Sequence, residues 1–421
     1  MPIRPAGAGA VAVLPKAALV QAPRPAVVST GRAATAAPVA SFTPAGASLA
    51  PAAAKAIDDY IKKLGSNGIV VIQGGKVIHQ TLAAGVRADQ PFNTWSMAKT
   101  FTASLVGIAI DQKLIQNLDQ PISDFLPELK PKTGIGGFFD HLFHPHNKEE
   151  RQVTVRQLLS GTSGVKWDLV GDYGMSVLSP DKSEAALHRG MQAAPGTQWR
   201  YNNHAVQLLE VVLRRALEKG VAAGRTDLKP TGKDPSIVEA FARKFLWDPI
   251  GMGPETSWDK DKAGHVTTFS SVRASVDGLQ KFGSMLMGGG KVGDRQIVSR
   301  AFVDEMTKPS QALNPNYGLL TWVKGPAASH LTNTNTVEKG TIMPTAPDGA
   351  FAIEGFGQNF VAAIPQRDLL IIHLKPGPVL EANHNRKPEL GNAIKDVKDL
   401  ATDGNRADED KLVAMVLAGL R

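Results

Sequence analysis

The chain of 421 residues contains no cysteine. It therefore has no disulfide bond, no thiolate nucleophile and no cysteine-bound zinc. A chain of this length does not need such cross-links, because it is long enough to bury a sizeable core in one large or two closely packed domains. The absence of cysteine leaves the cellular compartment open.

Long apolar runs and aromatic residues are also scarce. No run of eighteen apolar residues occurs, so no membrane span is predicted. Aromatic residues make up 6% of the chain and are not interleaved with basic residues, which argues against nucleic-acid binding despite a net charge of +8. Much of that charge belongs to residues 1–57, which hold no acidic residue and whose basic residues are Arg4, Lys16, Arg24, Arg32 and Lys55.

Residues 1–52 are rich in alanine, proline and glycine and show no sustained periodicity. Such a segment is predicted to be a disordered leader outside the folded part. Arg4 precedes a short apolar run, Gly7–Leu14, so an export leader, a disordered extension and a misplaced start codon all stay open. The localisation is accordingly unknown: periplasmic or secreted if residues 1–52 are a leader, and cytoplasmic otherwise.

The patterns after residue 52 predict strands early, helices in the middle and strands late. This order favours a discontinuous α/β domain, residues 53–127 and 255–421, with a helical domain, residues 128–254, inserted in it. The expected helices are Ala53–Leu64, Val153–Leu159, His204–Glu218, Ile237–Leu246, Ser275–Leu286 and Glu409–Leu420. The expected strands are the hairpin Gly68–Gln73 and Lys76–Leu82, and then Tyr317–Val323, Ala350–Ile353, Asn359–Ile364 and Leu369–Leu374.

Ser96 and Lys99 form a Ser-x-x-Lys pair at the start of a long apolar helix. Residues three apart lie on one face of a helix, so the hydroxyl and the amine can meet. A lysine becomes a base for a serine nucleophile when burial lowers its pKa, and the apolar helix provides such surroundings. A second copy, Ser257–Lys260, lies in a polar, turn-rich stretch and is the weaker candidate.

Two later motifs offer partners for this pair. Tyr201 and Asn203 precede a helix, where a phenol can relay protons and an amide can orient a lysine or a substrate carbonyl. The alternative is a turn with an asparagine at the helix N-cap. The segment Glu354–Phe360 is glycine-rich and opens a late strand, where a backbone N–H can face an oxyanion, with a bulge or hairpin turn as the alternative.

Together these motifs resemble, in order and spacing, the serine β-lactamase/penicillin-binding-protein superfamily. The flanking sequences Leu158–Gly164, Pro195-Gly196, Trp258-Asp259 and Asp277–Gly283 are similar as well. The resemblance covers about residues 53–400 and implies a β-lactamase/DD-peptidase-like α/β fold, with an antiparallel sheet flanked by helices and an all-helical insertion. Within the superfamily the third motif resembles the esterase and 6-aminohexanoate-dimer hydrolase branch, beside the class C β-lactamases, because Phe356 stands where β-lactamases and peptidases keep a cation.

The resemblance implies a serine hydrolase of amide or ester bonds with an acyl-serine intermediate. Its catalytic residues would be Ser96, Lys99, Tyr201 and Asn203, with no metal and no cofactor. The oxyanion would be held by the backbone of Ser96 and of Gln358, with Gly357 and Asn359 beside it. A class C β-lactamase, a D-alanyl-D-alanine carboxypeptidase and a non-catalytic binding or sensor protein of the same fold are the alternatives.

Further features complete the expectations. Tyr173 is a candidate substrate-binding lid residue, or else an ordinary surface aromatic. The segment Asp140–His146 contains three histidines but is interrupted by Pro145, which favours a surface loop over a metal site. No Gly-x-Ser-x-Gly sequence occurs, so an α/β-hydrolase triad is not supported. The expected partner is a small amide or ester substrate, and the chain is expected to be a monomer or homodimer.

Overall fold

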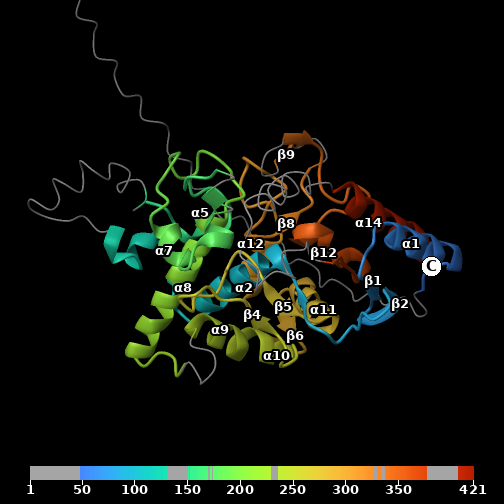
Figure 1. The fold of residues 1–421 in the computed structure, drawn as a ribbon, viewed down its shortest axis with the longest axis horizontal. Coiled ribbons are helices and arrows are strands. Elements are labelled where there is room, and N and C mark those ends of the chain that lie inside the picture. Colours follow the sequence, from blue (N-terminus) through green and yellow to red (C-terminus); the bar gives the residue numbers. More distant parts are fainter. Residues whose placement is uncertain are drawn as a thin grey trace, which may run out of the picture. The chain divides into compact units, whose positions relative to one another are not determined.

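The computed structural model describes residues 48–129, 150, 152–168, 171–172, 174–228, 236–326, 330–332, 337–376 and 406–421. These residues all belong to one unit, Phe42–Arg421, and their arrangement is shown in Figure 1. Across the described residues, no helix combines the length and the apolar character that a membrane crossing requires.

A six-stranded antiparallel sheet has the order β2-β1-β13-β12-β11-β8. Every residue of β1, β12 and β13 is buried, as expected when both faces of a sheet are covered. The edge strand β2 is partly exposed along its length. The strands are β1 (Gly68–Gln73), β2 (Lys76–Leu82), β8 (Trp322–Val323), β11 (Phe351–Gly355), β12 (Asn359–Ile364) and β13 (Leu369–Leu374).

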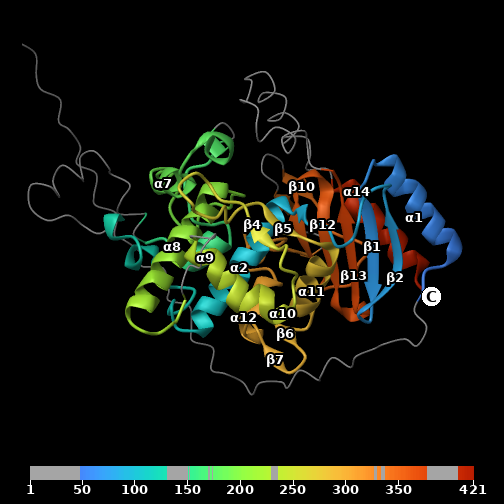
Figure 2. The ribbon, with the colours of Figure 1, turned by 60° about the horizontal axis from the view of Figure 1, so that its bottom comes forward.

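Helices cover this sheet. The helix α11 (Val276–Met287) contacts β12 and β13, and it approaches closely because Gly283 has no side chain between it and Leu370. The first and last helices, α1 (Pro51–Lys63) and α14 (Ala407–Gly419), pack against each other, and Figure 2 shows them beside the strands. Asp58 of α1 accepts a hydrogen bond from Thr81 of β2 at 2.6 Å, which ties α1 to the sheet.

A group of helices in the middle of the sequence packs around α8 (Asn203–Ala222). This helix contacts α5 (Val155–Leu159), α7 (Lys182–Leu187) and α9 (Ile237–Ala242), as well as α2 (Ala98–Asp111). The helix α2 therefore packs against the helical part through α8 and against the rest of the unit through α12 (Arg300–Met306) (Figure 1). The other helices and strands with described side chains are α10 (Asp248–Ile250), β3 (Phe92–Asn93), β4 (Ser257–Trp258), β5 (Val272–Ala274), β6 (Lys291–Val292) and β7 (Arg295–Gln296), and the backbone also forms β9 (His330–Thr332) and β10 (Val337–Lys339).

The expected fold class, an antiparallel sheet flanked by helices, is confirmed, and so is the early hairpin with its Gly74-Gly75 turn. The expected strand Tyr317–Val323 is wrong in length, because only Trp322 and Val323 are in β8. The chain reverses just before β8: Gly318 N donates to Thr321 O at 2.8 Å, and Leu320 has a φ of 51°. The domain limits at 127 and 254 stay a prediction.

Candidate active site

Ser96 lies in a short 3₁₀ turn, Trp95–Met97, that leads directly into α2. Trp95 has a φ of 50°, in the left-handed region that residues with a side chain rarely adopt. Its amide donates to Asn93 Oδ1 at 2.9 Å, which helps to hold this turn. Backbone strain of this kind clusters at functional sites, and here it lies one residue before the candidate nucleophile.

Lys99, the second residue of α2 and three residues beyond Ser96, faces Ser96. Its Nζ lies 3.0 Å from Ser96 Oγ and donates a hydrogen bond to the backbone oxygen of Phe269 at 2.8 Å. Lys99 is only 2% exposed, because every residue of α2 from Ala98 to Ala109 is buried. The structure therefore brings the two residues of the first motif within hydrogen-bonding distance, inside a buried helix.

Burial changes the charge state of Lys99. Loss of hydration lowers the pKa of its amine from 10.5 to about 7, and the carboxylate of Asp172 opposes this shift only in part. A substantial fraction of Lys99 is then neutral at neutral pH. A neutral amine with a free lone pair beside a serine hydroxyl is the arrangement that proton abstraction requires.

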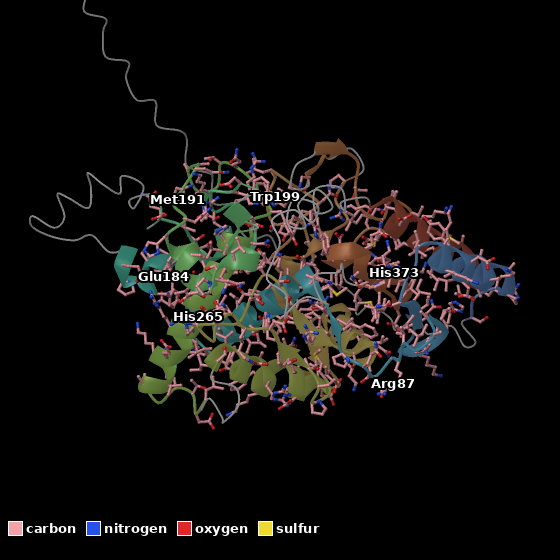
Figure 3. All side chains as sticks on the ribbon, in the orientation of Figure 1. Arg87, Glu184, Met191, Trp199, His265 and His373 are labelled. Carbon is pink, nitrogen blue, oxygen red and sulfur yellow. The ribbon has the colours of Figure 1, made fainter. Side chains whose placement is uncertain are left out.

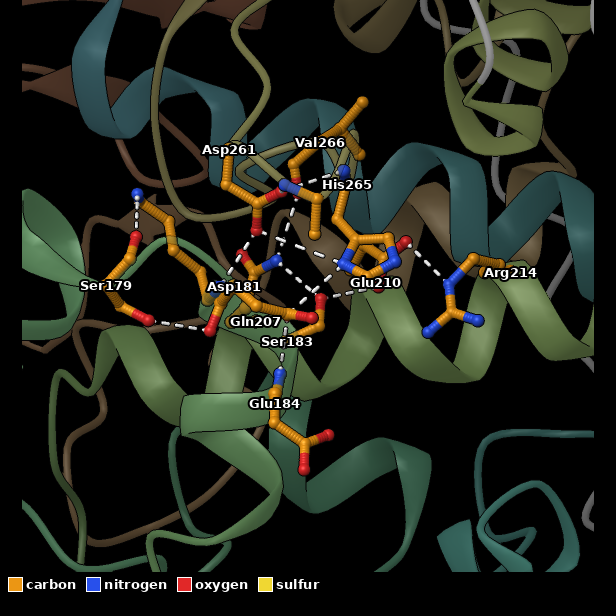
Figure 4. A network of polar contacts seen from close by, with 12 residues as sticks. Ser179, Asp181, Ser183, Glu184, Gln207, Glu210, Arg214, Asp261, His265 and Val266 are labelled. Carbon is orange, nitrogen blue, oxygen red and sulfur yellow. Dashed lines mark hydrogen bonds and ion pairs between the residues drawn. The ribbon is translucent and has the colours of Figure 1, made fainter.

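The segment that carries the backbone oxygen of Phe269, to which Lys99 donates, is held in place by hydrogen bonds from α8 and α2. Gln207 of α8, fully buried, donates to Val266 O at 3.0 Å and accepts from the Thr268 amide at 3.1 Å. Thr102 of α2 donates to Thr268 O at 2.7 Å. These bonds fix the segment 266–269, so that Phe269 O meets the lysine; Figure 4 shows Gln207 and Val266 within the wider network.

Tyr201 lies beside the same lysine. The Nζ atom of Lys99 is 4.6 Å from the centre of the Tyr201 ring. Burial raises the pKa of the phenol well above its usual value, although the nearby Ser96 hydroxyl works in the opposite direction. Tyr201 therefore stays protonated at all ordinary pH values and offers a proton rather than a negative charge.

Asn203 forms its side-chain hydrogen bond with Asp172. Its Nδ2 donates to Asp172 Oδ2 at 2.6 Å, and its backbone amide lies 3.2 Å from Asp172 Oδ1. The N-cap of α8 is Asn202, whose Oδ1 accepts from the Ala205 amide at 3.2 Å. Asn203 thus positions Asp172, the carboxylate that acts on Lys99 electrostatically, while Tyr173 lies outside the described residues.

The third motif is the hairpin turn between β11 and β12, which the sequence left as an alternative to the start of a strand. Gly357 and Gln358 have φ values of 74° and 62°, and Gly355 pairs with Asn359 across the turn. The turn lies against the Ser96 segment, since the Trp95 and Phe356 rings meet edge to face at 5.7 Å. All three sequence motifs therefore meet at Ser96.

Gly355 allows this contact. A Cβ atom on Gly355 would lie 2.3 Å from the backbone oxygen of Thr94, two residues before Ser96. We expect Gly355→Ala to push the turn away from Ser96 and to destabilise the protein by roughly 1–3 kcal/mol. Urea unfolding measures the loss, and Gly174→Ala, where a Cβ meets nothing within 4 Å, is the control.

The side chains of Gln358 and Asn359 are used to hold the turn. Gln358 Nε2 donates to Asp408 at 3.0 Å, and Asn359 Nδ2 donates to Phe356 O at 2.7 Å. His373 of β13, labelled in Figure 3, donates from Nδ1 to Gln358 O at 2.7 Å. These contacts hold the side chains of Gln358 and Asn359 and the backbone of the turn in place.

The sequence model of the Beta-lactamase family matches residues 53–390. The chain belongs to the Beta-lactamase family. Two curated relatives are Protein flp of Staphylococcus aureus, 24% identical over 44% of this chain and 36% of that protein, and Beta-lactamase-like protein 4 of Dictyostelium discoideum, 26% identical over 40% and 27%. The chain thus matches about a third of the length of these relatives.

Solved structures show the same fold. A protein described as a 6-aminohexanoate-dimer hydrolase, from Bacillus anthracis, has a TM-score of 0.56 at 17% identity, covering 83% of each chain. EstCE1, described as a hydrolase with promiscuous acyltransferase activity, has a TM-score of 0.53 at 16% identity, covering 77% of this chain and 92% of its own. A protein described as a β-lactamase from Bacteroides dorei has a TM-score of 0.52 at 18% identity, covering 82% and 97%.

One group in this Beta-lactamase family member has the residue types of a metal site. Asp181, Asp261 and His265 offer ligand atoms within 4.8 Å of one another (Figure 4). Asp181 accepts the Glu184 amide at 2.8 Å and caps α7, and Asp261 accepts the Lys182 amide at 2.8 Å. The carboxylates thus connect α7 to the loop that precedes Phe269, a structural role that accounts for them.

The second Ser-x-x-Lys copy differs from the first in its partners. Lys260 forms an ion pair with Glu239, which is 2% exposed and also accepts the Trp258 amide at 3.0 Å. Lys260 Nζ therefore lies against a carboxylate, whereas Lys99 Nζ lies against a hydroxyl and a backbone oxygen. The histidine-containing segment 140–146 lies outside the described residues.

Several residues of the site had no sequence signal. Phe269 acts through its backbone oxygen, which any residue type supplies. Gln207 and Asp172 are single polar residues outside the three motifs, and only the fold brings them to Lys99. Gln207 lies between Val206 and Leu208 in the expected helix His204–Glu218, and only the structure shows that its side chain is buried.

Proposed function

We propose that this protein is a serine hydrolase that cleaves ester or amide bonds of small molecules through an acyl-serine intermediate. The observation that carries the proposal is the 3.0 Å contact between Ser96 Oγ and the buried Nζ of Lys99. The lowered pKa of Lys99, about 7, supports its role as the base.

In the acylation step Ser96 Oγ attacks the carbonyl carbon while its proton passes to Lys99 Nζ. The carbonyl oxygen becomes negative and is stabilised by backbone N–H groups of Ser96 and Gln358, with Gly357 and Asn359 beside them. Fixed amides of this kind stabilise the transition state without reorganisation, because the hairpin turn is already held in place by its side chains.

The tetrahedral intermediate then collapses, and the bond from carbon to the leaving oxygen or nitrogen breaks. The leaving atom takes the phenol proton of Tyr201, which regains a proton from the Lys99 ammonium. Water next attacks the acyl-serine and gives a proton to the neutral Lys99 Nζ. Lys99 then returns this proton to Ser96 Oγ as the bond between the acyl carbon and Oγ breaks, which releases the acid and restores Ser96. The high pKa of Tyr201 suits a group that donates a proton and takes it back.

The acyl group is proposed to be uncharged where it adjoins the third motif. Trp95 and Phe356 form an aromatic pair there, and the resemblance puts Phe356 in the motif that supplies a cation for the substrate carboxylate in β-lactamases and peptidases. This favours an ester or a linear amide, as acted on by an esterase or a 6-aminohexanoate-oligomer hydrolase, over a β-lactam or a D-alanyl-D-alanine peptide. The activities named for two of the three structural neighbours, an aminohexanoate-dimer hydrolase and an acyl-transferring hydrolase, support this choice, whereas the third is described as a β-lactamase.

A fluorophosphonate probe tests the proposal directly. We expect one covalent adduct per chain, mapped by mass spectrometry to Ser96 and absent in Ser96→Ala. Failure of the wild-type protein to form an adduct would favour a non-catalytic binding protein of the same fold.

Substrate choice is tested by measuring turnover of p-nitrophenyl esters, nitrocefin and a linear ω-amino amide side by side. We expect esters or the linear amide to be turned over far faster than nitrocefin. Efficient nitrocefin hydrolysis would instead support a class C β-lactamase and contradict the proposed substrate class.

The pH profile should follow Lys99. Because the base acts only when neutral, kcat/KM should rise about tenfold per pH unit below a pKa of about 7 and level off above it. No decline is expected up to pH ~9, since burial raises the pKa of Tyr201 well above its usual value of 10. A rate independent of pH between 5 and 8 would argue against Lys99 as the base.

A further inference from the structure

A series of contacts runs from Lys99 to the C-terminal helix. Lys99 Nζ lies 4.6 Å from the Tyr201 ring centre, and Tyr201 stacks on Trp322 with ring centres 5.8 Å apart and 18° between the planes. The guanidinium carbon of Arg406, at the start of α14, lies 4.0 Å from the centre of the Trp322 ring. Arg406 therefore contacts the ring against which the candidate proton donor is packed.

Arg406 is held in this place by one carboxylate. Its Nη1 forms an ion pair with Glu354 Oε1, and the two side chains are only 12% and 16% exposed. Glu354 is on β11, two residues beyond Ala352, which pairs with Trp322 of β8. Side chains two residues apart on a strand share a face, so Glu354 and Trp322 face Arg406 from the same side of the sheet.

Geometry makes Glu354 the partner of Arg406, since their side chains form the ion pair. Burial raises the pKa of both Glu354 and the neighbouring Glu409, and the guanidinium of Arg406 opposes the shift at each. Asp410 accepts a hydrogen bond from the Met343 amide at 2.7 Å. Removal of either partner of the pair would leave a buried charge without compensation.

We propose that the Arg406–Glu354 ion pair is a positioning pair for the leaving-group step: by fixing Trp322, it holds the Tyr201 phenol in line to protonate the departing atom. The proposal rests on the proposed hydrolase function. Glu354 directly precedes Gly355 of the hairpin turn at Ser96, so the pair also connects α14 to the third motif.

The chemistry gives this role a signature. When an anilide is cleaved, the C–N bond breaks, its electron pair goes to nitrogen, and that nitrogen must take a proton from Tyr201. When a p-nitrophenyl ester is cleaved, the departing phenolate is stable without a proton. Loss of the position of Tyr201 therefore slows the anilide far more than the ester, whereas a general loss of structure slows both.

The test compares butyryl p-nitroanilide with p-nitrophenyl butyrate in Arg406→Met and Glu354→Gln. We expect kcat for the anilide to fall ~10–100-fold and kcat for the ester to fall less than ~3-fold, with little change in KM for either. Arg406→Lys, which keeps the charge and loses the planar group that stacks on Trp322, should give an intermediate loss. Arg215→Met is the matched control, since Arg215 pairs with Glu128 and donates to Phe125 O, contacts that are not part of the network that fixes Lys99, and it should leave the anilide-to-ester ratio unchanged.

Equal losses with both substrates, or no loss with either, would overturn the proposal. If Arg406→Met does not fold, as judged by circular dichroism, the test rests on Glu354→Gln, which keeps the size of the side chain. Tyr201→Phe should reproduce the selective loss, and an equal effect on both substrates would also overturn the proposal. A wild-type protein that forms no fluorophosphonate adduct would contradict the hydrolase function itself, which separates the two failures.

Discussion

Ser96→Ala should lower the rate of p-nitrophenyl butyrate hydrolysis by ~10⁴-fold or more, because it removes the atom that forms the acyl bond. The change should leave the fold intact, because alanine keeps the Cβ atom of serine and lacks only its hydroxyl group. Initial rates at saturating substrate, with circular dichroism to check folding, measure the effect.

Ser257→Ala is the matched control, because Ser257 belongs to the second Ser-x-x-Lys copy in the same chain. Lys260 of that copy is paired with Glu239, and Ser257 lies outside the three motifs that meet at Ser96. We expect Ser257→Ala to keep wild-type activity. A similar loss in both variants, or a Ser96→Ala protein with appreciable turnover, would show that the nucleophile has been assigned wrongly.

Lys99→Met should lower kcat by ~10³-fold or more while making the protein more stable. Methionine fills nearly the same buried volume but cannot take the proton of Ser96. Activity is lost because the hydroxyl then has no base within reach, since Tyr201 is already protonated. Single-turnover measurements of ester cleavage test the loss.

The gain in stability follows from the lowered pKa of Lys99. The unfolded chain binds this proton up to a pH near 10.5 and the folded chain only up to about 7, so the stability of the wild-type protein rises with pH across that window. At pH 6 the buried ammonium costs the folded state on the order of 4 kcal/mol, of which Lys99→Met should recover about half, since Phe269 O loses a donor. Urea unfolding at pH 6 and 9 tests this: the advantage of the variant should shrink at pH 9, and a variant less stable than wild type at pH 6 would contradict it.

Much of the fold could be predicted from the sequence because its signals are local. The hairpin Gly68–Leu82 has one strand on each side of a Gly-Gly turn. The strands Asn359–Ile364 and Leu369–Leu374 are apolar runs separated by a proline-containing turn. Ser96 and Lys99 could be placed because three residues along a helix fix their relative position. Tyr201 could be placed only through the order of the motifs, and the structure then puts its ring beside Lys99.

The remainder of the site depends on contacts between distant segments, which a single sequence does not encode locally. The Lys99–Phe269 bond joins residues 170 positions apart and involves a backbone oxygen. The Arg406–Glu354 pair joins the last helix to the sheet, and nothing in the sequence around Arg406 distinguishes it from a surface arginine. The strand expected at Tyr317–Val323 was too long because apolar residues there pack in a tight reversal as well as in a strand.

The most direct test of the central claim is the titration of Lys99 itself, followed by NMR in protein labelled with ¹³C and ¹⁵N in its lysine side chains. Comparison with Lys99→Met identifies the resonance. We expect the Lys99 amine to titrate near pH 7, well below the other lysines, whose ordinary value is 10.5. A Lys99 that stays charged until pH ~10, together with the bulk of the lysines, would contradict a neutral base beside Ser96.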